Sequence, residues 1–177
     1  PLVEAGDVFI HNDPYHGGSH LPDVNVIAPA FHDVRLLGFG CVRAHWPDIG
    51  SATPGSYGAV TEIYGEGLRM PPIRLYRDGK PDPAIEAIIF ANVRTPTERL
   101  GDLRAQVSAN WRAATRLQEL ATKYGTDTLL DYLPPDTVVC AASDIAGVAE
   151  RAAANVAERY EERRHDIERP VLSPDEL

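Results

Sequence analysis

The chain has 177 residues, of which 44% are hydrophobic and 24% charged, and its formal net charge at pH 7 is −9. This composition is typical of a globular domain with a hydrophobic core, and the acidic balance excludes a surface built to neutralise nucleic-acid phosphates. Two cysteines are too few for a disulfide scaffold, and no apolar run approaches the roughly 20 residues that cross a bilayer, so we expect a cytoplasmic protein. The chain starts Pro-Leu-Val-Glu, without Met or a signal-peptide pattern, as the interior of a longer protein or a processed end would.

Five of the six histidines lie in the first 45 residues, and three of them fall in one loop. Residues 7–10 form a short apolar run that leads into this loop, residues 11–23, which reads HNDPYHGGSHLPD. Imidazoles, carboxylates, prolines and glycines make a poor strand and a poor helix. They favour a rigid loop that directs several metal-binding groups to one place.

Two strands are predicted after the loop. Residues 24–31 are apolar and β-branched but contain Pro29, which indicates a strand with a bulged or edge-like end. Residues 36–42 form a second apolar run, and a hairpin turn is predicted at His32-Asp33 between the two. Such a hairpin would return His45, which follows the second strand, to the histidine-rich loop.

The next segment, residues 46–72, is rich in Gly, Pro, Ser and Thr. Its length suggests a functional cover and not a linker. Residues 73–76 predict a short strand, which ends at the turn signal Asp78-Gly79.

A long helix is predicted from Thr95 to Gly125. Thr95 and Glu98 suggest a capping box, and apolar residues follow at three-to-four spacing between Leu100 and Leu120. About 29 residues would span roughly 43 Å, so we expect the apolar stripe to pack against something beyond this chain. A second helix is predicted over residues 143–167. The elements together predict an α+β fold, with short strands and a metal-binding loop in the N-terminal half and long helices in the C-terminal half.

His20, Asp23 and His45 are the candidate metal ligands. Two imidazoles and one carboxylate leave open coordination positions, as catalytic metals require, and these donors suit Zn, Mn or Fe(II). The alternative interpretation is a hydrogen-bonded scaffold without a metal.

Asp13, His16 and Asp48 are the further candidates for catalytic or supporting roles. Asp13 stands before a proline, where it would fix a turn through its side chain or orient a ligand histidine. His16 is a reserve ligand, a substrate contact or an exposed loop residue, and Asp48 is equally open. We interpret His11 as a hydrogen-bonded partner near the site and His32 as a turn residue.

Other chemistries lack their motifs. The pair Gly17-Gly18 is not followed by the Lys-Ser/Thr of a phosphate-binding loop, so the chain has no recognisable nucleotide site. Ser19 has no nucleophile-elbow context, and Cys41 lies within an apolar strand without a base beside it. Covalent catalysis is therefore not expected.

Several motifs, in this order, resemble the hydantoinase B/oxoprolinase family. They are GDVFIHNDPY at 6–15, GGSHLPD at 17–23, RAHWPDIG at 43–50, EGLRMPP at 66–72 and ANVRTPTERLGDLRAQ at 91–106. The resemblance covers residues 1–132, and residues 133–177 are expected to form a divergent helical tail. The chain departs from the family at Trp46, where many relatives have a second histidine, a change expected to alter a contact behind the site or to enlarge an apolar wall.

The resemblance implies a B-type subunit, or part of one, of an ATP-dependent hydrolase of hydantoins, 5-oxoproline or lactams. An A-type partner would bind ATP and phosphorylate the substrate. The B-type part would hold a divalent metal through His20, Asp23 and His45, and a metal-activated water would attack the phosphorylated amide carbon.

The resemblance therefore implies a hetero-oligomer, in which ATP is used by the partner and not bound here. The chain is much shorter than family members, so we expect it to be inactive by itself. Two alternatives are a subunit of an ATP-dependent ketone carboxylase and a truncated, non-catalytic assembly subunit.

Overall fold

The computed structural model describes residues 3–56, 58–133 and 140–141. The chain divides into two compact units, Pro1–Cys140 and Ala141–Leu177. The helix predicted over residues 143–167, and most of the tail predicted from residue 133, lie outside the described residues.

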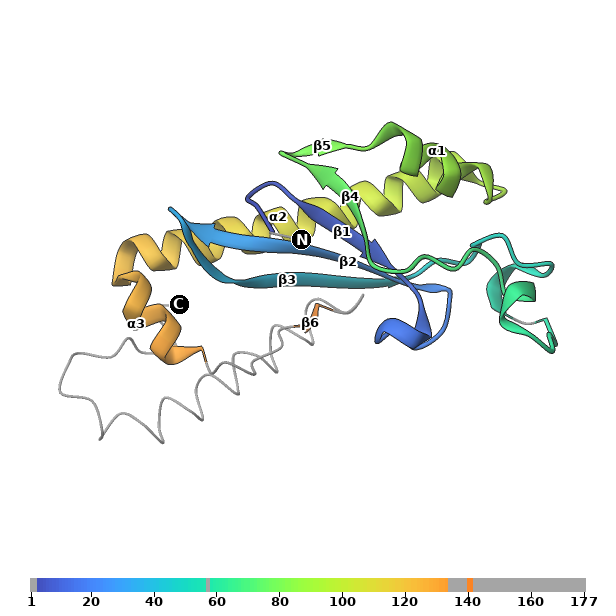
Figure 1. Ribbon diagram of the computed structural model, residues 1–177, viewed down its shortest axis with the longest axis horizontal. Coiled ribbons are helices and arrows are strands. Elements are labelled where there is room, and N and C mark those ends of the chain that lie inside the picture. Colours follow the sequence, from blue (N-terminus) through green and yellow to red (C-terminus); the bar gives the residue numbers. More distant parts are fainter. Residues whose placement is uncertain (1–2, 57, 134–139, 142–177) are drawn as a thin grey trace. The chain divides into compact units, whose positions relative to one another are not determined.

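The first unit is built on an antiparallel sheet whose strands follow the order β5-β4-β1-β2-β3 (Figure 1). The strands are β1 (Val8–His11), β2 (Asp23–His32), β3 (Arg35–His45), β4 (Ile73–Arg77) and β5 (Lys80–Pro81). A two-residue strand, β6 (Cys140–Ala141), falls at the boundary of the two units. The predicted strands and the predicted hairpin are thus confirmed.

The β2–β3 hairpin is the longest ladder, and its register pairs Asp23 with His45. The register shifts between Ala30 and Phe31, because Leu37 is an extra residue in β3 at that point. This shift confirms the bulged strand end predicted from sequence. Pro29 lies beyond Ile27, the last residue of β2 that pairs with β1, so its missing N–H interrupts no bond of that ladder.

The helices are α1 (Pro83–Ala91), α2 (Pro96–Tyr124) and α3 (Thr126–Tyr132), and three short 3-10 turns occur at η1 (Pro14–His16), η2 (Pro54–Ser56) and η3 (Ile63–Gly65). The 29 residues of α2 and its end at Gly125 match the prediction. The Thr95 side chain makes no capping hydrogen bond, which differs from the predicted box. The sequence reasoning also missed α1 and α3, and so the α+β class is confirmed with more helix than expected.

The missed helix α1 carries clear start signals. The Asp82 carboxylate accepts hydrogen bonds from the amides of Ala84 and Ile85, and Pro83 occupies the first helical position. The same residue types, a potential capping side chain followed by a proline, stand at Thr95 and Pro96 at the start of α2. Helix α1 has only nine residues, and only Ile89 among them is buried. It therefore lacks the repeated apolar spacing by which a helix is predicted from sequence.

One face of the sheet is covered by α2, which runs along β2 and β3 (Figure 1). Leu103 and Val107 of α2 are buried together with the inward residues of the strands, among them Val24 and Val26. Further along, Ala121 packs in a second cluster with residues of the hairpin and α3. The apolar stripe is therefore covered in part within the chain, but Trp111 remains 40% exposed. The expectation that the stripe packs against something beyond this chain stays a prediction.

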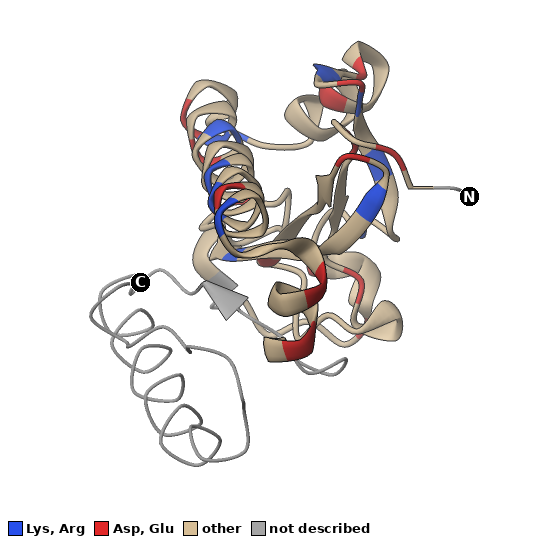
Figure 2. Ribbon diagram, turned by 90° about the vertical axis from the view of Figure 1, so that its left-hand side faces the viewer, with Lys and Arg blue, Asp and Glu red and all other residues tan. Residues whose placement is uncertain are grey.

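The outward surface of α2 carries basic and acidic side chains interspersed (Figure 2). Such mixed charge is typical of a solvated helix face. None of the helices in the described residues has the length and apolar character needed to cross a bilayer.

Candidate metal centre

Three side chains predicted as metal ligands come together at one end of the β2–β3 hairpin. Asp23 begins β2, His45 ends β3, and the two are register partners. The Asp23 Oδ1 atom lies 2.9 Å from His20 Nε2 and 3.1 Å from His45 Nδ1. One ligand atom from each residue lies within 4.8 Å of the other two.

The cluster is open on one side. The side chains of His20 and His45 are 42% and 49% exposed, while that of Asp23 is 18% exposed. Two imidazoles and a carboxylate that converge at an accessible point are the donor set of a metal with free coordination positions. The residues present therefore fit a divalent ion such as Zn, Mn or Fe(II).

The loop that carries His20 is constrained by close packing of its backbone and by a buried side chain. A Cβ at Gly18 would lie 2.8 Å from the carbonyl oxygens of both Asn12 and Asp13, so the loop is too tight there for any larger residue. The fully buried side chain of Leu21 anchors the loop in the core, next to His20. The backbone on both sides of His20 is thus constrained by the packing of Gly18 and Leu21.

A second row of side chains lies one step further along the same sheet face, and sequence reasoning missed it. Asn25 and Arg43 are register partners, two residues from Asp23 and His45 respectively, so strand alternation places them on the same face. Arg43 Nε donates to Asn25 Oδ1 at 2.9 Å, and Arg43 Nη1 donates to Ser19 Oγ at 2.9 Å. Arg43 therefore ties the sheet to the loop beside His20.

Asp13 and His16 pair with each other and not with the cluster. One Asp13 oxygen accepts from the Tyr15 amide at 3.0 Å, and the other lies 3.0 Å from His16 Nδ1. Burial by itself raises the pKa of Asp13, but the bonds from Tyr15 and His16 and the charge of Arg69 outweigh it and lower the pKa. The turn-fixing role expected of Asp13 is confirmed, and a catalytic role for either residue stays a prediction.

Asp48 lies apart from the cluster and forms an ion pair with Arg94. Its carboxylate accepts from the Gly50 amide at 3.0 Å, from the Arg94 amide, and from Arg94 Nη1 at 2.8 Å. Arg94 Nη2 in turn donates to the Ser51 carbonyl at 2.7 Å. Asp48 thus fastens the start of the covering segment to the residues before α2, which favours a positioning role over a catalytic one.

Asp48→Asn is expected to change the dependence of stability on pH. Burial raises the pKa of Asp48, but hydrogen bonds from Arg94 and Gly50 outweigh burial and lower the pKa below its ordinary value. The folded state therefore gains stability above the unfolded pKa of about 3.9 and loses it as the pH falls through the lower folded pKa. The free energy of unfolding from urea titration at pH 7 should be lower for Asp48→Asn than for wild type. This difference should vanish as the pH falls below about 4. The exposed Asp131→Asn should follow wild type throughout, and a gap independent of pH would contradict this assignment.

His11 and His32, which were not predicted as ligands, have different surroundings. His32 contacts Thr126 Oγ1 at 2.8 Å and Thr122 Oγ1 at 3.2 Å, so it ties the hairpin to the end of α2 and the start of α3. His11 is 8% exposed, and its Nδ1 has no hydrogen-bond partner among the described residues, which corrects the expectation of a satisfied histidine. Burial, followed by the charge of Arg43, lowers the pKa of His11 below its ordinary value.

Trp46 does not lie behind the cluster. It follows His45, so it turns to the helix-covered face, where it is buried in the core and donates from Nε1 to Gln106 Oε1 at 2.9 Å. Gln106 Nε2 donates to the carbonyls of Val24 and Val42. The tryptophan therefore joins α2 to the hairpin, and the effects expected of it beside the site stay predictions.

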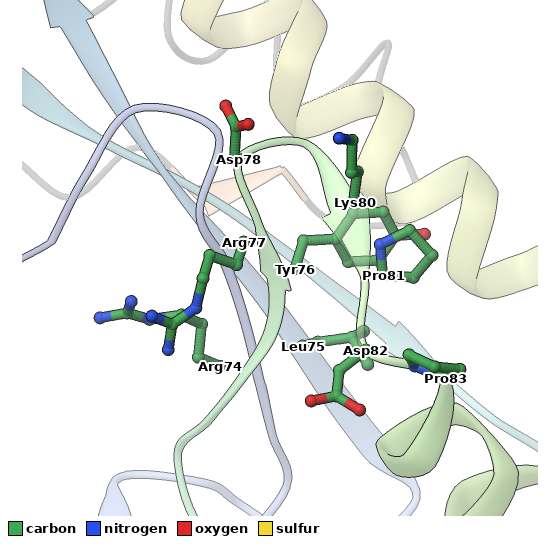
Figure 3. A pocket seen from close by; sticks show the side chains of 9 residues that line it. All are labelled: Arg74, Leu75, Tyr76, Arg77, Asp78, Lys80, Pro81, Asp82 and Pro83. Atoms are coloured by element: carbon green, nitrogen blue, oxygen red, sulfur yellow. The ribbon is translucent and has the colours of Figure 1, made fainter.

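A hollow of about 350 Å³ lies at the β4–β5 hairpin (Figure 3). Figure 3 shows Arg74 and Arg77 on one side of β4 and Tyr76 on the other. Arg74 Nε lies 3.4 Å from Asp7, and Asp82 caps α1. Because these charged groups hold the scaffold, we place the candidate site at His20 and not here.

Comparison with known proteins gives one consistent family. The family model described as Hydantoinase B/oxoprolinase matches residues 2–142. A protein from Pseudomonas sp. (strain NS671), described as one of the subunits of a D-/L-hydantoinase, is 44% identical over 126 residues, which are 70% of this chain and 21% of that protein. The chain spans about a fifth of the length of the curated relatives it matches first.

Two solved structures share the fold. The ATP-dependent caprolactamase from Pseudomonas jessenii superposes with a TM-score of 0.68 at 31% identity, over 86% of this chain and 24% of that one. An acetone carboxylase structure, nucleotide-free, gives a TM-score of 0.70 at 21% identity, over 92% of this chain and 20% of that one. The second likeness is one of fold alone.

Proposed function

Because this chain belongs to the hydantoinase B/oxoprolinase family, we propose that it is the metal-binding part of an ATP-dependent enzyme that opens cyclic amides. The observation that carries the proposal is the convergence of His20, Asp23 and His45 at an accessible point of the β2–β3 hairpin. The names of the relatives, hydantoinase and caprolactamase, support a cyclic amide as substrate.

The residues of this chain would hold the metal ion and keep its ligands in position. His20 and His45 supply neutral imidazole ligands, and Asp23 supplies the charge that makes the set selective for a cation. Arg43 and Asn25 keep the loop and the strand ends in place, so the ligands need little rearrangement. A divalent ion bound there would lower the pKa of a water molecule and polarise the substrate carbonyl.

The ATP-dependent first step of the reaction would be carried out by a partner subunit. This chain has no phosphate-binding motif, and two relatives are named as single subunits of larger enzymes, a hydantoinase and a caprolactamase. An A-type subunit in a cytoplasmic hetero-oligomer would use ATP to phosphorylate the amide oxygen, which makes an unreactive ring electrophilic. The chain by itself would then be inactive.

The carboxylase alternative has only a likeness of fold in its favour, since that structure is 21% identical. The assembly-subunit alternative does not account for the convergence of the three metal-ligand side chains. Hydrolysis is therefore the function that the site supports best.

The test is a reconstituted assay with the chain in the context of its full protein and an A-type subunit. ATP-dependent opening of hydantoin, 5-oxoproline or caprolactam should proceed without bicarbonate. Asp23→Asn should lower kcat by at least about 100-fold, since catalysis would lose a ligand of its ion. Asp33→Asn, in the turn at the other end of the hairpin, should retain activity. Turnover of a ketone that requires bicarbonate, without any ring opening, would refute the proposal.

A further inference from the structure

A groove of about 380 Å³ lies beside His20. One wall comes from the histidine-rich loop, with Tyr15 and His20, and the other from the covering segment, with Val60, Ile63 and Glu66. His20 belongs to both the groove and the ligand cluster. A molecule in the groove would therefore lie next to any ion held by the cluster.

The two walls are joined by one buried side chain. Asn12 is fully buried, and its Nδ2 donates to the Leu21 carbonyl at 2.7 Å in the loop and to the Leu68 carbonyl at 2.9 Å in the covering segment. Its Oδ1 accepts from the Met70 amide at 2.7 Å. Asn12 thus joins the backbone of the loop to the backbone of the covering segment, so the two walls are held together without a ligand.

Glu66 is held at a fixed point of the second wall. The next residue, Gly67, has φ +123, and a Cβ there would lie 2.5 Å from the Ile49 carbonyl oxygen. That carbonyl accepts from the Leu68 amide at 2.7 Å. The backbone after Glu66 is therefore pinned against the start of the covering segment.

The lining has an apolar part and a polar part. Tyr15, Val60 and Ile63 offer apolar surface, whereas Glu66 offers a hydrogen-bond acceptor. His20 lies at the side of the groove that borders the ligand cluster. The volume lies near the lower limit for small-molecule sites, which suits a single small ring. A matching ligand has apolar ring atoms, an N–H donor, and a carbonyl next to that donor.

We infer that this groove receives the ring of the cyclic amide, and that Glu66 determines specificity by accepting a hydrogen bond from the ring N–H. The ring carbons lie against Tyr15, Val60 and Ile63, and the carbonyl faces His20. This inference rests on the proposed function, since the cyclic amide is the substrate class named there.

The test compares two ligands, one with the ring N–H donor and one in which a methyl group replaces that hydrogen. The full chain is loaded with zinc and titrated with 2-pyrrolidinone and with N-methyl-2-pyrrolidinone, and dissociation constants are taken from NMR chemical shifts. Wild type should prefer the N–H ligand about tenfold, because a hydrogen bond to a charged acceptor contributes on the order of 1.5 kcal/mol. Glu66→Ala should bring the ratio close to one, and Glu66→Gln, which keeps an oxygen acceptor without the charge, should give an intermediate ratio.

Glu86→Ala is the matched control, since Glu86 is half-buried like Glu66 but lies in α1, outside the groove. It should keep the wild-type ratio. Zinc content is measured for every variant and should be unchanged. A zinc-loaded Glu66→Ala or Glu66→Gln that keeps the full preference refutes the role of Glu66 alone, whereas a wild-type chain that takes up no zinc refutes the proposed function and the groove assignment with it.

Discussion

Asp23→Asn is expected to lower the affinity of the chain for a divalent metal by more than about 100-fold, since even partners outside the coordination shell change metal affinity roughly 10- to 100-fold. A single oxygen of Asp23 lies within 3.1 Å of a nitrogen of each histidine, so this carboxylate is the common neighbour of the set. Asparagine keeps the shape of the side chain but removes its charge. Elemental analysis after dialysis, together with titration against a chelator, measures the loss.

The histidines allow matched controls. His20→Ala and His45→Ala should lose metal as Asp23→Asn does, whereas His32→Ala and Asp33→Asn should retain it, because both lie at the turn end of the hairpin. If His20→Ala and His45→Ala bind metal as tightly as wild type, the cluster is a hydrogen-bonded scaffold, and its assignment as a metal centre is wrong.

Asn12→Ala is expected to lower the free energy of unfolding by about 3 kcal/mol or more, because each buried group left without a partner costs about 1–3 kcal/mol. The substitution would leave the carbonyls of Leu21 and Leu68 and the amide of Met70 without their partner. Urea unfolding, followed by circular dichroism, gives this free energy.

Asn92→Ala tests whether burial causes the effect. Asn92 is exposed at the end of α1, and its Nδ2 donates to the Ile88 carbonyl, so its loss should cost less than about 0.5 kcal/mol. Equal losses at the two positions would show that Asn12 joins nothing of consequence. A stable Asn12→Ala chain with an unchanged groove would contradict the role of Asn12 in joining the two walls.

The ligand cluster was predictable because it depends on one local device. Residues 24–31 and 36–42 form adjacent antiparallel strands with a short turn, and an antiparallel hairpin must bring its two outer ends together. His45 therefore meets Asp23 whatever the rest of the chain does. The alternation of side chains along the same strands also places Trp46 on the opposite face, and Arg43 and Asn25 on the face of the ligands.

The remaining parts of the site depend on distant partners, which no local pattern encodes. Asp48 and Arg94 are 46 residues apart, and Asn12 reaches residues 56 and 58 positions away. An aspartate that orients a ligand and one that clamps a turn look alike in sequence. Only tertiary packing distinguishes them, which is why the residues alone leave the roles of Asp13 and Asp48 open.

The extra residue Leu37 in β3 bears on how this hairpin can change over evolution. If β3 kept all its residues but paired without the bulge, Ala44 and not His45 would stand opposite Asp23, and His45 would turn to the face that α2 covers. Deletion of one residue of β3 between Leu37 and Ala44 can therefore be absorbed by loss of the bulge, with Asp23 still opposite His45, whereas insertion of one residue there with the bulge kept would turn His45 to the other face. Homologous hairpins that keep the three ligands should therefore lack a residue in β3 only where they also lack the bulge.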